Sequence, residues 1–328
     1  MVTTWGCAAD SALGQPFAVL RSSGLGGHRE SVDIVAQVAK AREGALVVPA
    51  TELAALVITG ADRQSWLNGL VTCDVARLRA GDAAYGLVVA QKGRILSDFV
   101  VCVREEELTV LLPRSVSASV RAHFEGHLIM EDAQMASEEQ TAGVRAWFVH
   151  GPRAGDVARA AAADAEHTWF SLDVTGLGGA VVLGKKEPAW DGPVGDDAGW
   201  NALRLERGVP RFGVDFDTTM YPQEASLEKR AVSFDKGCYL GQEVVCMLEM
   251  RGHVKRKLVP LKLASGKVPA KGEGVTTTAG EKIGEVTSAA ESPTLGVPVA
   301  LAMIKYAHAS SKEELRVGDA VAKIIALS

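Results

Sequence analysis

Three β-like runs follow one another closely, at residues 85–90, 95–103 and 108–112. The two segments between them, 91–94 and 104–107, are short and polar, as turns are. Connections this short join antiparallel strands, because a parallel pair needs a crossover of a dozen or more residues. The pattern therefore predicts an antiparallel meander and disfavours a βαβ unit.

The segments around this meander predict both helices and strands. A short helix is expected after Asp62, because Trp66 and Leu70 then lie on one side of it. The Asn68-Gly69 pair is typical of hairpin turns, but the flanking residues do not alternate, so the helix is favoured. Further strands are expected at 46–48, 56–58, 128–130, 144–149, 169–174 and 180–183, and further helices from about 115, 153 and 200.

The chain changes character after Pro260. Short β-like pieces alternate with glycines and prolines, among them Gly272, Gly274 and Pro293. These residues mark turns between short strands. The pattern predicts a small all-β barrel or sandwich at the C-terminal end.

Composition excludes several classes of protein. The 328 residues are 47% hydrophobic, which is typical of a globular chain of two or three domains. The formal net charge of -5 gives no cationic field for nucleic acid, and 5% aromatic residues are few for a base-stacking surface. No apolar run approaches the roughly 20 residues that span a bilayer, and the first ten residues lack a secretory pattern. We therefore expect a cytoplasmic protein that binds neither membranes nor, stably, nucleic acid.

The cysteine pattern fits a reducing compartment. The cysteines are widely spaced, at Cys7, Cys73, Cys102, Cys238 and Cys246, and no CxxC pair occurs. Such spacing favours free thiols over a disulfide framework or a preformed zinc site. The histidines also lack metal-ligand spacing, so no metal site is expected.

A glycine-rich turn carries the cysteine with the most chemical promise. Gly237 and Gly241 bracket Cys238, and they predict a tight turn that leads into a helix. A thiol close to a helix N-terminus and to Lys236 is favoured as the thiolate. The alternative is a small buried hydrophobe, which is the common fate of a free cysteine.

A basic run follows this predicted helix. In an extended strand, Arg251, His253, Lys255 and Lys257 would share one face. A cationic face of this kind binds carboxylates or phosphates through charge-assisted hydrogen bonds. A solvated strand face without a ligand is the alternative.

Asp98 lies within an otherwise apolar predicted strand. An unpaired buried carboxylate is costly, so Asp98 needs a partner or a functional cavity. A cationic ligand or an amine nitrogen is one such partner, and a nearby arginine is the other. Arg204 and Glu206, on the helix before Gly208, leave the same two alternatives open.

Five motifs occur along the chain in a set order. They are Trp66-Leu67-x-Gly69-Leu70-x-Thr72-x-Asp74-Val75, Lys92-Gly93-Arg94-Ile95-Leu96-x-Asp98, Pro222-Gln223-Glu224-Ala225, Lys236-Gly237-Cys238-Tyr239-x-Gly241-Gln242-Glu243 and Arg251-Gly252-His253-Val254-Lys255-Arg256. Together they resemble the YgfZ-type folate-binding proteins, which are relatives of the glycine cleavage T-protein (aminomethyltransferase). The resemblance covers about residue 45 to the C-terminus, and its Lys-Gly-Cys motif is the most specific part.

The resemblance implies an α+β fold with three domains around a central, folate-sized cavity. Two α+β units built on antiparallel sheets would occupy residues 1–140 and 141–257, the second carrying the Lys-Gly-Cys motif. A C-terminal β-barrel would occupy residues 258–328. The elements expected above agree with this arrangement.

The resemblance also implies a function and the residues that perform it. The cofactor would be tetrahydrofolate or a derivative, and the role would be assembly or repair of iron–sulfur proteins, with a link to tRNA modification. Iron–sulfur client or assembly proteins would then be partners. Lys236 and Cys238 would be the functional pair, and Asp98 would lie near the folate amine. The folate contacts would be Asp98, Arg204, Glu206, Lys236, Gly237, Gly241 and Arg251.

Two departures bear on the reaction. Cys73 stands where the family commonly has Asn, and Ser97 replaces the first acid of the carboxylate pair of an aminomethyltransferase. The T-protein itself lacks the Lys-Gly-Cys motif. These differences count against an aminomethyltransferase. Aminomethyl transfer to tetrahydrofolate, with Asp98 steering the amine nitrogen, is therefore the alternative function and not the leading one. A scaffold in which the Gly-Cys turn only packs is the third hypothesis.

Overall fold

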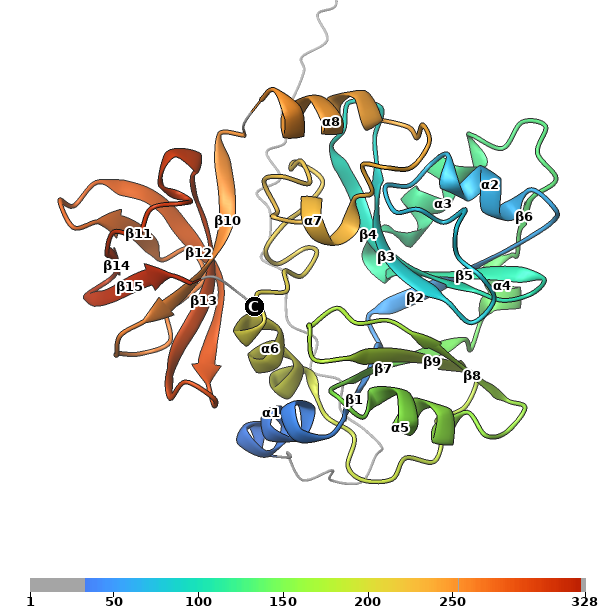
Figure 1. Cartoon of the computed structure of the whole chain (residues 1–328), viewed down its shortest axis with the longest axis horizontal. Helices are drawn as coiled ribbons and strands as arrows, with labels where there is room; N and C mark the ends of the chain where they lie inside the picture. Colours follow the sequence, from blue (N-terminus) through green and yellow to red (C-terminus); the bar gives the residue numbers. More distant parts are fainter. Residues whose placement is uncertain (1–32, 253, 326–328) are drawn as a thin grey trace, which may run out of the picture. The chain divides into compact units, whose positions relative to one another are not determined.

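The structure, a computed structural model, describes residues 33–252 and 254–325. The strands in these ranges form two antiparallel sheets and one closed barrel (Figure 1). The predicted α+β fold with two antiparallel sheets and a C-terminal barrel is thereby confirmed. In the same ranges, no helix is long and apolar enough to cross a membrane.

The first sheet contains the predicted meander and has the strand order β3-β4-β5-β2-β6. Its strands are β2 (Leu53–Thr59), β3 (Ala83–Val89), β4 (Ile95–Val103), β5 (Glu107–Pro113) and β6 (Gln134–Met135). One face is covered by α2 (Arg63–Asn68) and α3 (Ser117–Glu125), whose Trp66 and Phe124 pack edge to face at 5.9 Å between ring centroids.

One strand of this region was placed wrongly from the sequence. Residues 128–130 are not a strand, and the pairing with β2 is made instead by β6. Ile129 and Met130 are largely exposed, so their apolar character reflects no buried strand.

The second sheet has the order β1-β7-β9-β8. Its strands are β1 (Leu46–Pro49), β7 (Arg145–His150), β8 (His167–Ser171) and β9 (Gly179–Gly184). Because β1 pairs with β7, this sheet takes a strand from either side of the boundary predicted near residue 140. The domain limits themselves stay a prediction.

The two sheets pack against each other through apolar side chains. Val100 and Leu111 of the first sheet lie in one buried cluster with Phe170 and Val181 of the second. Tyr85 and Phe148 border the same cluster and are only partly buried. The interface between the two sheets is therefore open on the side of these two residues.

The C-terminal strands close into a barrel of order β10-β13-β12-β11-β14-β15. They are β10 (Arg256–Leu263), β11 (Gly274–Thr277), β12 (Lys282–Ser292), β13 (Val297–Lys305), β14 (Leu315–Val317) and β15 (Ala320–Ile324). Alternate residues of β10, including Val259 and Leu261, fill its apolar interior, as expected for a small barrel.

The remaining helices connect or cover these sheets. They are α1 (Ile34–Glu43), α4 (Glu138–Thr141), α5 (Ala154–Ala161), α6 (Asp197–Glu206), α7 (Glu228–Ala231) and α8 (Gln242–Met250), with 3-10 turns at Arg114–Val116 and Tyr306–His308. The long connection between α6 and α8 carries both the Pro-Gln-Glu-Ala and the Lys-Gly-Cys motifs.

The basic segment does not form the extended strand that the sequence suggested. Helix α8 runs to Met250 and β10 begins only at Arg256, so the four basic side chains do not share one strand face. Arg256 pairs with Glu224 at 3.1 Å and Lys257 with Glu228 at 2.7 Å, which joins the barrel to the connection before it. His253 lies outside the described residues.

Candidate ligand-binding cavity

A cavity of about 850 Å³ lies where the two sheets, α6 and the connection after α6 meet. Its wall includes Tyr85 and Asp98 from the first sheet, Phe148 and His150 from the second, and Trp200 from α6. This volume falls within the range of about 300–1,000 Å³ that is usual for small-molecule sites. The cavity is therefore large enough for a ligand with more than one ring.

Asp98 is the carboxyl group placed in this wall by β4. The Tyr85 hydroxyl donates a hydrogen bond to its Oδ2 at 3.0 Å. Burial is the main reason why the pKa of Asp98 rises to about 6, and the hydrogen bond from Tyr85 opposes that rise. Asp98 can therefore gain or lose a proton close to neutral pH.

The pairing of β3 with β4 explains why Tyr85 meets Asp98. Asp98 lies directly opposite Leu87, and Tyr85 is two residues from Leu87 on the same strand face. Such diagonal neighbours lie within reach of a long aromatic side chain. Sequence reasoning did not identify Tyr85, although the short turn between the two predicted strands contains the information needed to pair them.

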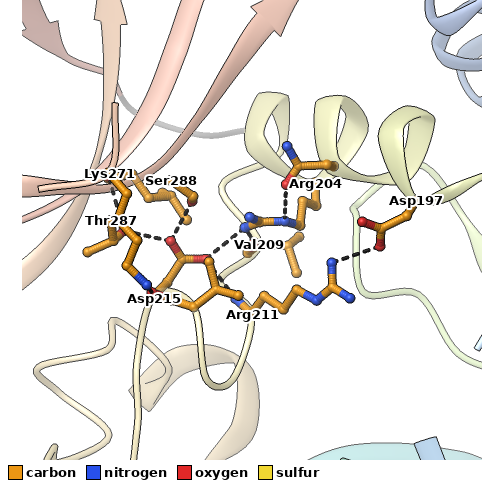
Figure 2. Close-up of polar contacts among 11 residues, drawn as sticks. Asp197, Arg204, Val209, Arg211, Asp215, Lys271, Thr287 and Ser288 are labelled. Carbon is orange, nitrogen blue, oxygen red and sulfur yellow. Dashed lines mark hydrogen bonds and ion pairs between the residues drawn. The ribbon is translucent and has the colours of Figure 1, made fainter. Parts of the chain in front are cut away.

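Arg204 also lines the cavity, but its charge is already neutralised. The residue is 1% exposed, and its guanidinium donates to Asp215 Oδ2 at 2.7 Å and to the Val209 carbonyl at 3.1 Å. Figure 2 shows Asp215 between Arg204 on α6 and two hydroxyl groups of the barrel. Thr287 and Ser288 donate these hydroxyls to Asp215 Oδ1. Arg204 thus shapes the cavity wall rather than offering an unpaired cation.

Glu206, two residues after Arg204 and so on the opposite side of α6, faces the barrel instead of the cavity. Its carboxylate accepts hydrogen bonds from the hydroxyl of Ser292 and from both the amide and the hydroxyl of Thr294. It is not among the residues that line the cavity. The structure thus places Glu206 as a link between α6 and the barrel.

Lys236 is buried away from the cavity lining. Its Nζ donates to the carbonyls of Asn68, Val71 and Cys73 at 2.6, 2.8 and 2.7 Å. These three bonds use all the donors of an ammonium group, and burial lowers the Lys236 pKa to about 8. The lysine thus ties the Lys-Gly-Cys turn to the segment after α2, and its ammonium has no donor left for the Cys238 thiol.

Cys238 is exposed on the same turn. Gly241 ends the turn with a φ of 81°, and a Cβ at this position would lie 2.5 Å from the Ala90 carbonyl oxygen. Only glycine fits there, because this φ is strained for other residues and a Cβ would collide with the turn between β3 and β4. The predicted turn and the helix after it are confirmed.

Comparison with known proteins agrees with this architecture. The GCVT N-terminal domain model matches residues 26–183, and the model of the glycine cleavage T-protein C-terminal barrel domain matches residues 256–326. The chain belongs to the glycine cleavage T-protein family. A structure of this family, the glycine cleavage system aminomethyltransferase T from Bartonella henselae, superimposes with a TM-score of 0.73 at 18% identity, covering 90% of this chain and 88% of that one.

Relatives of this T-protein family member carry two kinds of name. A probable aminomethyltransferase of Halobacterium salinarum is 29% identical, with 87% of each chain covered. A tRNA-modifying protein YgfZ of Sodalis glossinidius is 28% identical, with 70% of this chain and 74% of that protein covered. The resemblance drawn from the sequence motifs is thereby confirmed at the level of the family.

Within this T-protein fold, the structure separates the residues selected from the sequence into two groups. Asp98 and Arg204 line the cavity. The other group lies outside the lining and consists of Glu206, Lys236, Gly237, Cys238, Gly241 and Arg251. Arg251 is exposed at the end of α8.

Proposed function

We propose that this protein binds tetrahydrofolate or a derivative in the cavity and acts as an accessory protein for the assembly or repair of iron–sulfur proteins. The observation that carries the folate proposal is the Asp98–Tyr85 pair, which places a hydrogen-bonding carboxyl group in a largely apolar wall of a cavity of about 850 Å³. A flat heterocycle with ring N–H groups matches both features. Family membership supports the same ligand class.

The residues of the wall would bind and orient such a ligand. When ionised, Asp98 accepts hydrogen bonds from N–H groups, and its protonated form donates one. Tyr85 fixes the carboxyl orientation, and Val100, two residues along β4 on the same strand face, adds an apolar side chain to the wall. Tetrahydrofolate would supply amine nitrogens that carry one-carbon units. A carboxyl group with a pKa of about 6 suits proton exchange with such nitrogens near neutral pH.

Calorimetric titration with tetrahydrofolate, under anaerobic conditions, tests folate binding. Asp98→Asn is expected to weaken binding about 10-fold or more, because hydrogen bonds to charged groups contribute about 1.5–3 kcal/mol. Tyr85→Phe removes the hydrogen bond that orients the Asp98 carboxyl group and is expected to weaken folate binding less. Asp156→Asn, on the exposed face of α5, is the matched control and should bind as the wild type does. No binding by the wild-type protein would refute the proposal.

The accessory role is supported by the separation of the thiol from the cavity. Cys238 is exposed on its turn, where it is accessible to another protein, and it is not part of the cavity lining. A relative named tRNA-modifying protein YgfZ belongs to the group whose motifs this chain resembles, and that resemblance implies a role of this kind. In cells whose only copy carries Cys238→Ser, we expect iron–sulfur enzyme activities to fall, while Cys246→Ser leaves them unchanged. Normal activities with Cys238→Ser would remove the thiol from the function.

Aminomethyl transfer is the second candidate, favoured by the relatives named aminomethyltransferase and by Asp98 itself. Ser97, which replaces the first acid of the pair, is buried and donates its hydroxyl to the Asp98 carbonyl oxygen at 2.7 Å. A single carboxyl group would therefore have to assist amine transfer. Conversion of an aminomethyl-lipoyl carrier and tetrahydrofolate to methylenetetrahydrofolate, ammonia and the dihydrolipoyl carrier, lost in Asp98→Asn, would establish this activity.

A further inference from the structure

Thr72 is a buried residue of the motif after α2, and the proposed function gives it no role. Its exposed fraction is 0%, so the polar atom of its side chain needs partners inside the protein. The hydroxyl accepts the amide of Leu87 on β3 at 2.9 Å and donates to the Ala231 carbonyl at 2.6 Å. Because a hydroxyl has a single hydrogen to donate, these two bonds fix its orientation. Thr72 therefore joins two segments that are far apart in the sequence.

The backbone of Thr72 reinforces both connections. Its amide donates to the Leu87 carbonyl at 3.0 Å, and its carbonyl accepts the amide of Ser233 at 2.9 Å. An antiparallel bridge between Val71 and Val88 continues the contact with β3. Residues 71–72 thus extend the first sheet beyond its edge strand β3, and the chain at 231–233 is bonded to their other side.

On the side of β3, these bonds lead to the ligand cavity. Leu87 lies directly opposite Asp98 in the pairing of β3 with β4. Tyr85, two residues from Leu87, donates its hydroxyl to the Asp98 carboxyl group. Hydrogen bonds thus run across the sheet from the strand that carries Asp98 to Thr72.

On its other side, Thr72 holds a segment that runs from the cavity to the exposed thiol. This segment begins at α7, where Leu227 and Arg230 line the cavity. It ends at the turn on which Cys238 is exposed. Thr72 is bonded between these two ends, at residues 231 and 233. A ligand that contacts α7 therefore contacts the same short piece of chain that carries the thiol.

The turn itself is fastened to the same stretch of chain as Thr72. The Lys236 ammonium donates to three carbonyls within residues 68–73. The Leu240 amide donates to the Gly69 carbonyl at 3.0 Å. Residues 68–73 therefore hold the whole turn, and Thr72 provides the attachment that is nearer to the cavity.

We propose that Thr72 is a positioning residue that couples ligand binding in the cavity to the Cys238 turn. A ligand that contacts both α7 and the Asp98–Tyr85 pair restrains the two segments that the Thr72 hydroxyl joins. The hydroxyl extends this restraint to residues 233–241, and without it the restraint ends at α7. The inference rests on the proposed function and deepens it, because the bound ligand then sets the place at which the thiol meets a partner protein.

Amide hydrogen exchange, followed by mass spectrometry with and without saturating tetrahydrofolate, tests this coupling, because exchange reports local opening of each segment. In the wild type, tetrahydrofolate should slow exchange about 3- to 10-fold in β4 and in residues 233–241, as expected when a restraint equivalent to one hydrogen bond is added. Thr72→Val replaces the hydroxyl by a methyl group. In this variant the ligand should still slow exchange in β4 but no longer in 233–241. Thr72→Ser keeps the hydroxyl and should restore the wild-type response.

Thr109→Val is the matched control, because Thr109 is also buried in the first sheet but lies on β5, which β4 separates from β3. It should keep the ligand response of residues 233–241. If Thr72→Val only accelerates exchange and the ligand still slows 233–241 as in the wild type, Thr72 is merely structural and the coupling is overturned.

A measurement on the wild type alone does not depend on the folding of any variant. Protein that binds tetrahydrofolate and protects β4, but shows unchanged exchange in residues 233–241, would overturn the coupling and leave the proposed folate binding intact. Wild-type protein that binds no tetrahydrofolate would refute the proposed function and, with it, this inference.

Discussion

Arg204 and Asp215 form a buried ion pair, with 2.7 Å between a guanidinium nitrogen and a carboxylate oxygen. The second carboxylate oxygen accepts hydroxyl groups from Thr287 and Ser288 on β12 (Figure 2). One carboxylate therefore joins the cavity wall on α6 to the barrel. Burial lowers the Arg204 pKa, and the charge and hydrogen bond of Asp215 counteract that effect.

Asp215→Asn should be strongly destabilising. Breaking a buried ion pair leaves an uncompensated charge and costs about 3–5 kcal/mol. Denaturant unfolding measures this loss. Asp156→Asn is the control, because it breaks the exposed Arg159–Asp156 pair and should change stability by less than about 0.5 kcal/mol. Equal effects of the two substitutions would contradict a structural role for the buried pair.

Asp98→Asn should stabilise the protein more at high pH than at low pH. The pKa of Asp98 in the folded protein, about 6, exceeds its ordinary value of 3.8, so its contribution to stability is present below pH 3.8 and is lost as the pH rises through 6. The advantage of the variant should thus grow between pH 4 and pH 7, by on the order of 1–2 kcal/mol after allowance for partial exposure. Unfolding free energies across this range test it, and an advantage independent of pH would contradict it.

Lys236→Met should destabilise the fold through the carbonyls it leaves behind. Three backbone oxygens lose their ammonium partner, and an unsatisfied buried polar group costs about 1–3 kcal/mol. We expect a loss of at least about 2 kcal/mol in denaturant unfolding. Lys229→Met, at an exposed position on α7, is the control. A Lys236→Met protein as stable as the control would show that these bonds contribute little.

The thiols should differ sharply in their reaction with iodoacetamide at pH 8. Among the cysteines in the described part of the chain, Cys238 is exposed and should be modified first, whereas Cys73 and Cys102 are buried and should react only on unfolding. Burial also raises the pKa of Cys73 to about 12, which suppresses its thiolate. Peptide mass spectrometry resolves the rate at each site. Native-state labelling of Cys73 as fast as that of Cys238 would contradict this order.

Local signals in the sequence determined most elements of the fold. The short polar turns between the runs at 85–90, 95–103 and 108–112 permit only antiparallel pairing, and Gly241 has the conformational freedom that the turn before α8 requires. The predictions of a strand at 128–130 and of an extended basic segment were wrong, because apolar or alternating character alone does not show whether a partner strand exists.

The tertiary structure alone decided which side chains meet across the chain. Lys236 bonds to carbonyls more than 160 positions earlier, and His150 stacks on Trp200 from another element. Such contacts depend on how sheets, helices and barrel pack, because the free energy of burying apolar surface in the whole core sets these positions. Local sequence patterns identified Asp98 and Cys238 as chemically notable; packing placed one in a cavity wall and the other on the surface.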